Sequence, residues 1–244
     1  MGFNIDILVN ENKKELTELE RLIGYRFTDL RLLQKALIHS SYAFEQAQGG
    51  KDNEILEFVG DAVLDLVIGY TLSKRYPAMR EGDLTRIRAS LVNESHLAEM
   101  ARSFELGRFL CLGKGEDASS GRNKSSILSC AFEAVIGAVF EDSGYEHTTD
   151  LVQRIFNSEI ENKKKDLLLA DAKSRLQEEL QEKFNEPPTY RLEREEGPSH
   201  QKRFSVSVIF QGNVLGSGTA SSKKEAEQRA AAAALKQQDT SVND

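Results

Sequence analysis

The chain has 244 residues and a formal net charge of −7, and 39% of its residues are hydrophobic. This composition describes a soluble globular protein of one or two domains, and the acidic balance argues against a protein that is basic over its whole surface. Charges interrupt the longest apolar stretches within about ten residues, whereas a membrane span needs about 20 apolar residues.

The beginning of the chain and its cysteines both indicate an intracellular, cytoplasmic protein. Residues 1–6 lack the basic and apolar regions of a signal peptide. The two cysteines, Cys111 and Cys130, do not make a disulfide framework, so a reducing compartment is the default. No Cys/His spacing matches a zinc site, and we interpret both cysteines as small hydrophobic residues in apolar surroundings.

The first fifty residues predict short helices. Apolar residues recur at helical spacing over residues 11–24, and a second helix begins after Thr28 or Asp29, either of which is a good N-cap. His39 follows that helix and precedes two serines. A histidine at a helix end more often forms a cap than a nucleophilic pair, so we interpret His39 as structural. The polar residues 45–52 indicate a loop.

An acidic stripe on an otherwise apolar helix is the central feature of the sequence. Glu54, Glu57, Asp61 and Asp65 are spaced by three or four residues, which places them on one face. Apolar residues fill the rest, so we expect a buried helix that ends at Pro77. Partly buried carboxylates need a partner, and a hard cation such as Mg²⁺ is the natural one. The alternative is a solvated acidic face.

A second buried helix supplies another carboxylate. After a helix that begins near Glu81 and a Gly/Ser-rich loop over 113–125, residues 126–140 are apolar except for Glu133. If this helix packs beside the acidic stripe, the carboxylates of both converge. Such a site suits Mg²⁺ and the hydrolysis of a phosphodiester. No strand pattern appears in the first 160 residues, so this half is predicted to be all-α.

The pattern changes after the charged run that starts at Lys163. Helical residues 172–184 precede three short strand-like segments, and the capping box Ser222-Lys223-Lys224-Glu225 opens an alanine-rich helix over 226–236. The order α-β-β-β-α predicts a small α+β domain. We therefore expect an all-α domain over 1–162, a linker over 163–170, the α+β domain over 171–238 and a tail over 239–244.

Residues 53–64, Asn-Glu-Ile-Leu-Glu-Phe-Val-Gly-Asp-Ala-Val-Leu, resemble the signature motif of the ribonuclease III family. The likeness extends over about residues 15–238 and includes 23–27, 36–42, 81–85 and 132–138. Residues 171–238 resemble a double-stranded RNA-binding domain. The resemblance implies an all-α endonuclease domain and a homodimer that cuts double-stranded RNA with Mg²⁺, or with Mn²⁺ as a substitute. It further implies 5′-phosphate and 3′-hydroxyl ends, short 3′ overhangs, and roles in rRNA precursor and mRNA processing.

The resemblance also implies roles for individual residues. Glu57, Asp61 and Glu133 match the metal-binding carboxylates, with Asp61 and Glu133 in the catalytic roles. Glu54 and Glu81 match acidic residues that line the cleft or support the site. Phe58 matches an aromatic residue of the dimer interface, although an ordinary core role fits its type equally well. The RNA contacts that the resemblance implies are Gln177, Glu178, Ser199, His200, Ser222, Lys223 and Lys224.

The chemistry of Ser222, Lys223 and Lys224 also favours RNA binding, independently of the resemblance. Lysines at a helix N-terminus combine backbone donors with positive charge, which suits phosphates across a groove of A-form RNA. The alternative for Lys223 and Lys224 is a solvated helix start. Within an α-β-β-β-α domain that carries the 197–200 turn, RNA binding is the better interpretation.

One position departs from the family pattern. Cys130 stands three residues before Glu133, where the family usually carries aspartate, and a thiol is a poor partner for a hard cation. Either a neighbour such as Ser129 compensates, or the site needs more metal, or the protein binds RNA without cutting it. The acidic residues that match the family are otherwise all present, namely Glu54, Glu57, Asp61, Glu81 and Glu133. We therefore favour an active enzyme over a non-cleaving RNA-binding dimer. A third, weaker hypothesis is metal-dependent hydrolysis of small phosphate compounds.

Overall fold

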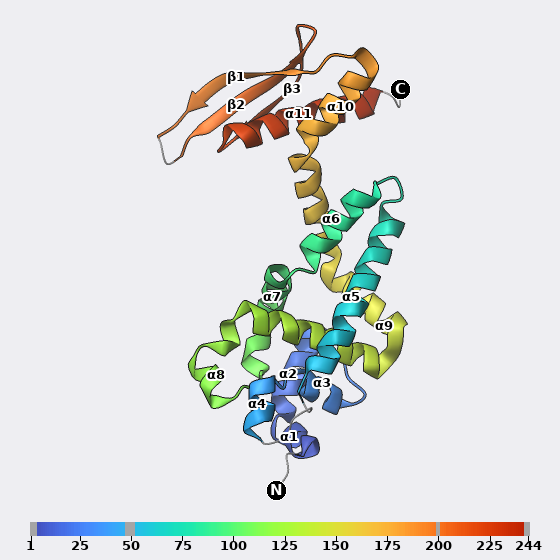
Figure 1. Ribbon diagram of the computed structural model, residues 1–244, viewed down its shortest axis with the longest axis vertical. Helices are drawn as coiled ribbons and strands as arrows, with labels where there is room; N and C mark the ends of the chain where they lie inside the picture. Colours follow the sequence, from blue (N-terminus) through green and yellow to red (C-terminus); the bar gives the residue numbers. More distant parts are fainter. Residues whose placement is uncertain (1–3, 47–51, 199–200, 242–244) are drawn as a thin grey trace. The chain divides into compact units, whose positions relative to one another are not determined.

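The computed structural model describes residues 4–46, 52–198 and 201–241, and these fall into two compact units within Met1–Ile160 and Glu161–Asp244. The described residues of the first unit are helical, with one isolated bridge between Ile38 and Cys111. The second unit has the order α-β-β-β-α (Figure 1). The predicted fold class is therefore confirmed. No helix among the described residues is long and apolar enough to cross a membrane.

The helices of the first unit follow the apolar periodicity of the sequence. Asp29 caps α3, because its Oδ1 accepts a hydrogen bond of 2.9 Å from the backbone N–H of Arg31. The elements are α1 (Ile5–Glu11), α2 (Lys13–Ile23), α3 (Leu30–Ala36), α4 (Ser40–Glu45), α5 (Glu54–Arg75), α6 (Glu81–Leu91), α7 (Glu94–Ser103), η1 (Leu106–Phe109), α8 (Lys114–Ala118), η2 (Gly121–Asn123) and α9 (Ser125–Ala170).

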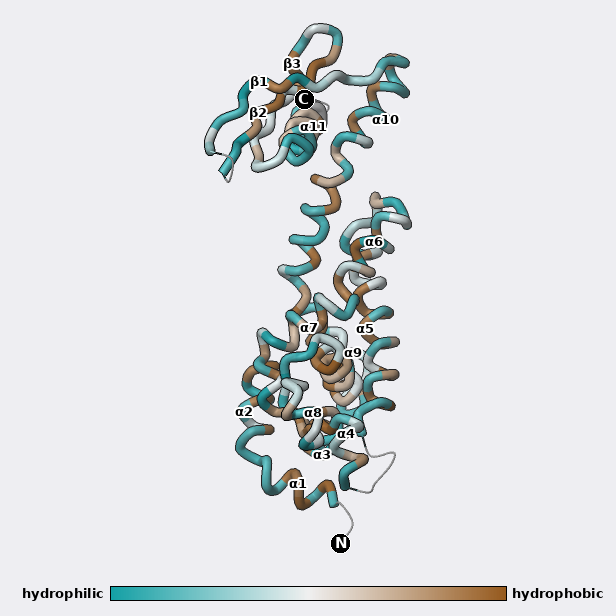
Figure 2. Tube along the Cα trace, turned by 60° about the vertical axis from the view of Figure 1, so that its left-hand side comes forward, coloured by the Kyte–Doolittle hydropathy of each residue, from teal (hydrophilic) through white to brown (hydrophobic). Residues whose placement is uncertain are grey.

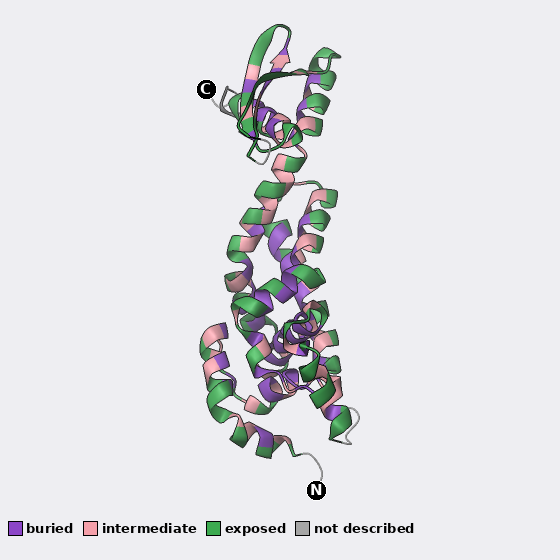
Figure 3. Ribbon diagram, turned by 90° about the vertical axis from the view of Figure 1, so that its left-hand side faces the viewer, coloured by how far each residue is buried: buried purple, intermediate pink, exposed green. Residues whose placement is uncertain are grey.

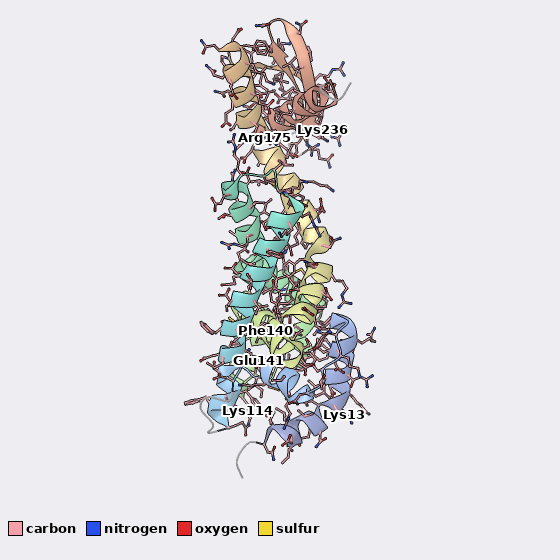
Figure 4. The ribbon with its side chains drawn as sticks, turned by 90° about the vertical axis from the view of Figure 1, so that its right-hand side faces the viewer. Lys13, Lys114, Phe140, Glu141, Arg175 and Lys236 are labelled. Atoms are coloured by element: carbon pink, nitrogen blue, oxygen red, sulfur yellow. The ribbon has the colours of Figure 1, made fainter. Side chains whose placement is uncertain are left out.

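Helix α9 is longer than the sequence suggests and is kinked at Gly144, where φ is 75° and ψ is −171°. Phe140 and Glu141 lie on the straight stretch just ahead of this kink (Figure 4). After the kink, helix continues through 163–170, the segment expected to be a linker. The physical reason is composition, since Lys, Leu and Ala all favour helix. The domain limits themselves stay a prediction.

Two glycines bring the backbones of α5 and α9 together. A Cβ at Gly60 would lie 1.8 Å from the carbonyl oxygen of Glu133, and a Cβ at Gly137 would lie 2.0 Å from that of Leu56. Only residues without a side chain fit at this crossing. The residues buried near this crossing include Leu56, Val63 and Leu64 of α5 and Ala134 and Ile136 of α9. Figure 2 shows that α9 is largely hydrophobic before its kink, and Figure 3 shows buried residues gathered in the interior of the first unit. This close approach is what positions the site described below.

The prediction that α5 is buried nearly all round is wrong for one face. Its buried residues lie on one side of the helix, but four large apolar side chains at helical spacing are exposed on another face. They are Ile55, Phe58, Leu66 and Tyr70, with exposures of 66%, 74%, 56% and 51%. Periodicity reports apolar character only, and a face that is not covered within the chain has the same pattern as a core face.

The second unit is a three-stranded antiparallel sheet in the order β1-β2-β3, with α10 and α11 on one face (Figure 1). The elements are α10 (Ala172–Phe184), β1 (Thr189–Glu196), β2 (Arg203–Phe210), β3 (Asn213–Ala220) and α11 (Lys223–Ser241). Leu176, Leu180, Val208, Phe210 and the alanines of α11 form the core between sheet and helices. Strand β1 extends to Glu196, which pairs with Arg203 of β2.

Candidate active site

Carboxylates from two helices converge beside the crossing of α5 and α9. Ligand atoms of Glu57, Cys130 and Glu133 all lie within 4.8 Å of one another. The same region holds a cavity of about 460 Å³, lined by Glu54, Glu57, Phe58, Asp61 and Glu133. The structure thus brings together the acidic stripe and the lone carboxylate of the second helix.

Negative charge is concentrated at this cavity. Glu133 is half-buried, and its pKa is raised to about 7, first by burial and then by the charges of Asp61, Glu57 and Asp65. Asp61 is exposed at the cavity wall. A cation bound here would relieve the mutual repulsion of these groups. Carboxylate oxygens are what a hard divalent ion prefers, so Glu57, Asp61 and Glu133 fit such an ion and would hold it.

Cys130 does not lie in the apolar surroundings that the sequence led us to expect. Burial, a hydrogen bond from the thiol to Glu57 and the charges of Glu57 and Glu133 together raise its pKa to about 12. The thiol therefore stays protonated and neutral. Ser129, the candidate for compensation, is buried and donates a hydrogen bond of 3.0 Å to the carbonyl oxygen of Ser126.

The remaining acidic candidates occupy different places. Glu54 lines the cavity, whereas Glu81 is not among the lining residues and accepts a hydrogen bond of 2.8 Å from Thr85 on α6. Asp65 lies 3.7 Å from the Nε of Arg88. This ion pair joins α5 to α6 and partly neutralises the far end of the stripe, which the sequence could not indicate.

His39 has the structural role that was predicted. Its Nδ1 accepts a hydrogen bond of 3.2 Å from the backbone N–H of Ser41 and lies 2.8 Å from the Ser41 hydroxyl oxygen. The imidazole thus caps the N-terminus of α4.

The candidate RNA contacts of the second unit are exposed where they are described. Gln177 and Glu178 lie on α10, and Lys223 and Lys224 form the first turn of α11. Ser222 caps this helix by accepting a hydrogen bond of 3.2 Å from the backbone N–H of Glu225. The other two candidates, Ser199 and His200, lie outside the described residues.

Sequence reasoning missed a basic cavity of about 600 Å³ in the same unit. Lys202, Arg203 and Arg229 contribute three cations to its lining, and Glu225 contributes one carboxylate. Arg229 pairs with Glu225 at 2.7 Å. The register of the strands brings these residues together, and register cannot be read from the separate segments.

The match to known families covers both units. A family model described as Ribonuclease-III-like matches residues 29–159, and one described as Double-stranded RNA binding motif matches residues 172–238. A helical nuclease unit followed by a double-stranded RNA-binding unit is thus the class of protein that the fold and the site define.

Whole-chain relatives extend this match. The chain is 67% identical over 236 residues to ribonuclease 3 of Desulfotalea psychrophila, which covers 97% of this chain and 98% of the relative. It is 41% identical over 225 residues to ribonuclease 3 of Syntrophobacter fumaroxidans, covering 90% and 93%. The solved nuclease domain of ribonuclease III from Campylobacter jejuni is similar with a TM-score of 0.54 and 41% identity, covering 58% of this chain and 95% of that domain.

The chain belongs to the ribonuclease III family and is an endoribonuclease with a double-stranded RNA-binding domain. Membership in this family implies a divalent metal cofactor, and the carboxylates at the α5–α9 crossing fit one.

Proposed function

We propose that this protein is a homodimeric, Mg²⁺-dependent endonuclease that cuts both strands of duplex RNA. Its products carry 5′-phosphates, 3′-hydroxyls and short 3′ overhangs, and its substrates are rRNA precursors and mRNA in the cytoplasm. Mn²⁺ substitutes for Mg²⁺. The single observation that carries the proposal is the convergence of Glu57 and Glu133, with Asp61 on the wall of the same cavity.

The acidic side chains of the site have different roles in the reaction. Glu57, Asp61 and Glu133 would hold the divalent ion, which would supply charge stabilisation at the phosphate and a more acidic, and so more nucleophilic, water. Asp61 and Glu133 are the catalytic pair. Glu133 must lose a proton for ion binding, because its pKa of about 7 keeps it partly protonated near neutral pH. Glu54 at the cavity rim and Glu81 on α6 support the site toward the substrate.

The second unit selects the substrate. Proteins read A-form RNA by shape, phosphates and 2′-hydroxyls, since its major groove hides the base edges. Lys223 and Lys224 add charge to the backbone donors at the start of α11, and this suits phosphates. We assign minor-groove contacts to Gln177 and Glu178 on α10 and to Ser199 and His200, which lie outside the described residues.

The exposed apolar face of α5 supports a dimer. Phe58 is 74% exposed beside the cavity, where an isolated chain would gain nothing from a large aromatic side chain. The similar nuclease domain from Campylobacter jejuni is described with a flexible region involved in dimer formation. We propose that Phe58 and its neighbours on this face pack against a second copy of the chain.

A cleavage assay with matched RNAs tests the proposal. Labelled duplex RNA is incubated with Mg²⁺ and wild type, Glu133→Ala or Cys130→Asp, and the product ends are mapped. We expect wild type to cut the duplex and to spare single strands, and Glu133→Ala to be inactive. Equal cleavage of single strands would contradict duplex specificity.

The second candidate function is a dimer that binds duplex RNA without cutting it, and one observation favours it. Cys130 stands among the carboxylates in place of an oxygen ligand. Absence of cleavage by wild type at every metal concentration, together with retained duplex binding, would establish this function. Cleavage gained only by Cys130→Asp would show that the thiol alone is responsible.

A further inference from the structure

Cys130 gives the metal site a ligand type that a carboxylate site lacks. Its sulfur and one oxygen each of Glu57 and Glu133 lie within 4.8 Å of one another, and all three side chains are half-buried. Glu57 comes from α5, and the other two residues lie one turn apart on α9. A thiolate with two carboxylates is a donor set for a borderline-soft ion of the Zn²⁺ class, because sulfur favours such ions and Mg²⁺ does not.

Two ligand sets therefore overlap in one place. The oxygen set comprises Glu57, Asp61 and Glu133, which face the cavity together. The mixed set replaces Asp61 by Cys130 and keeps the two glutamates. Since both sets need Glu57 and Glu133, an ion in one set excludes an ion from the other.

We propose that Cys130, Glu57 and Glu133 form a binding site for a thiophilic divalent cation of the Zn²⁺ class, which competes with the catalytic ion and inhibits the enzyme. Three protein ligands leave a fourth, tetrahedral position for water. On binding, the S–H bond breaks, a sulfur–metal bond forms, and the proton leaves to solvent. This inference rests on the metal site of the proposed function but not on RNA cleavage.

The geometry requires only side-chain adjustment. Ligand atoms around one tetrahedral ion stand roughly 3.5 Å apart, given metal–ligand distances of about 2.0–2.3 Å. The three atoms are already within 4.8 Å, and glutamate side chains can rotate to close the difference. The backbones need not move, because Gly60 and Gly137 already hold α5 and α9 in direct contact.

Cadmium serves as the probe, because a Cd²⁺–thiolate bond has an ultraviolet charge-transfer absorption that neither Cd²⁺ nor the protein has alone. Metal-free full-length wild type is titrated with Cd²⁺, and Cys130→Ser, Cys111→Ser, Glu57→Gln and Glu133→Gln are titrated in parallel. We expect wild type and Cys111→Ser to reach the full absorption at one ion per chain, and Cys130→Ser to show none. Each glutamine variant should bind Cd²⁺ about tenfold or more weakly, because each lacks one charged ligand.

Zinc is then tested by competition. Zn²⁺ should displace Cd²⁺ at similar concentrations, whereas Mg²⁺ should displace it only in large excess. An absorption that persists in Cys130→Ser would assign the bond to Cys111 and overturn the proposal. The proposal would also be overturned if Glu57→Gln and Glu133→Gln both showed the absorption and the Cd²⁺ affinity of wild type, because Cys130 would then bind the ion without the glutamates. Circular dichroism of each variant identifies any that misfold. Cys111→Ser is the matched control, because it loses a cysteine but keeps the three proposed ligands.

Loss of cleavage and loss of thiophilic binding can be told apart. If wild type binds Cd²⁺ as expected but never cuts duplex RNA with Mg²⁺, the proposed function fails and this site stands. If wild type cuts duplex RNA but shows no thiolate absorption with Cd²⁺, the site fails and the enzyme stands. The inhibitory part is checked by cleavage in Mg²⁺ with added Zn²⁺, where Cys130→Ser should need at least several-fold more Zn²⁺ for half inhibition.

Discussion

At the scale of single residues, the site depends on how burial and neighbouring charge set protonation. Glu133 lies between the carboxylates of α5 and the apolar interior, and its pKa rises to about 7 as a result. Cys130 lies beside Glu57 and stays a neutral thiol. The site therefore has less negative charge than it would have with a carboxylate at position 130, and we expect it to bind Mg²⁺ more weakly for that reason.

Cys130→Asp tests this expectation. An aspartate here adds a carboxylate beside Glu57 and Glu133, so half-maximal cleavage should need several-fold less Mg²⁺, roughly 1 kcal/mol of binding free energy. The measurement is the cleavage rate of one duplex RNA over a Mg²⁺ titration. Cys111→Asp is not a suitable control, because Cys111 packs against the apolar side chains of Leu8, Ile38 and Ala43. The control is therefore Cys130→Ser, which removes the thiol without adding a charge. A Cys130→Asp titration that coincides with that of wild type would contradict the account.

Glu133 also predicts how the stability of the metal-free protein depends on pH. The ordinary pKa of 4.5 applies in the unfolded chain, whereas the folded protein holds this proton up to about pH 7. Between these values the folded state binds more protons than the unfolded state, so the free energy of unfolding falls as pH rises through this window. Thermal melts of Glu133→Gln should show a smaller decline than wild type. Added Mg²⁺ should stabilise wild type more than the variant, and parallel pH curves for the two proteins would rule out this role.

At the scale of elements, the crossing of α5 and α9 controls the site. Gly60→Ala or Gly137→Ala must push the helices apart, because the new Cβ would lie about 2 Å from a carbonyl oxygen of the other helix. Overpacking a fitted core costs roughly 1–3 kcal/mol, and a backbone clash puts these variants at or above the upper end. Cleavage should fall along with stability, since Glu57 and Glu133 separate.

Gly82→Ala is the matched control for those two variants. Gly82 is also helical, in α6, but a Cβ there meets no atom within 4 Å. Alanine favours helix over glycine, so this variant should be as stable as wild type or more stable by up to about 1 kcal/mol. Denaturant unfolding measures the free energy of unfolding of Gly60→Ala, Gly137→Ala and Gly82→Ala. Equal stability of Gly60→Ala and Gly82→Ala would show that the helices do not touch as described.

Helices α5 and α9 show which features of the site can be predicted from the sequence and which cannot. Apolar periodicity predicted both helices, and the isolated charge at Glu133 marked it as a candidate for a functional or paired role before its surroundings were known. The meaning of Gly60 and Gly137 stayed hidden, because close approach is a property of two segments far apart in the chain. The exposure of Phe58 and the polar surroundings of Cys130 cannot be read from periodicity for the same reason, and only the family resemblance pointed to them. Periodicity describes one helix, and these features arise from its neighbours.

At the scale of the whole molecule, one unit recognises duplex RNA and the other cuts it. Replacing Lys223 and Lys224 by alanine should weaken duplex binding to a similar degree for all sequences, because phosphates carry no sequence information. The slope of affinity against salt should fall by about one per lysine lost. Lys236→Ala, near the other end of α11 (Figure 4), is the control and should leave the slope unchanged. An unchanged slope in the double variant would remove these lysines from the interface.

The apolar face of α5 predicts the state of assembly. Phe58→Ala combined with Leu66→Ala removes two large side chains that are 74% and 56% exposed, so the folded monomer should lose little stability. The dimer should dissociate at higher protein concentration than wild type, which sedimentation velocity measures. Tyr145→Ala, at an exposed side chain of α9, is the control. A double variant that sediments like wild type at every concentration would assign the dimer to another face.

The most direct test of the central claim is the rate of duplex RNA cleavage at saturating Mg²⁺ for Glu133→Gln against Glu141→Gln. Both residues lie on α9, but Glu133 belongs to the carboxylate cluster and Glu141 is exposed two turns further along (Figure 4). Glu133→Gln should lose about a thousandfold or more, roughly 4 kcal/mol of transition-state stabilisation, because it removes a metal ligand. Glu141→Gln should cut at the wild-type rate. Comparable rates for the two variants would mean that cleavage does not take place at the α5–α9 site.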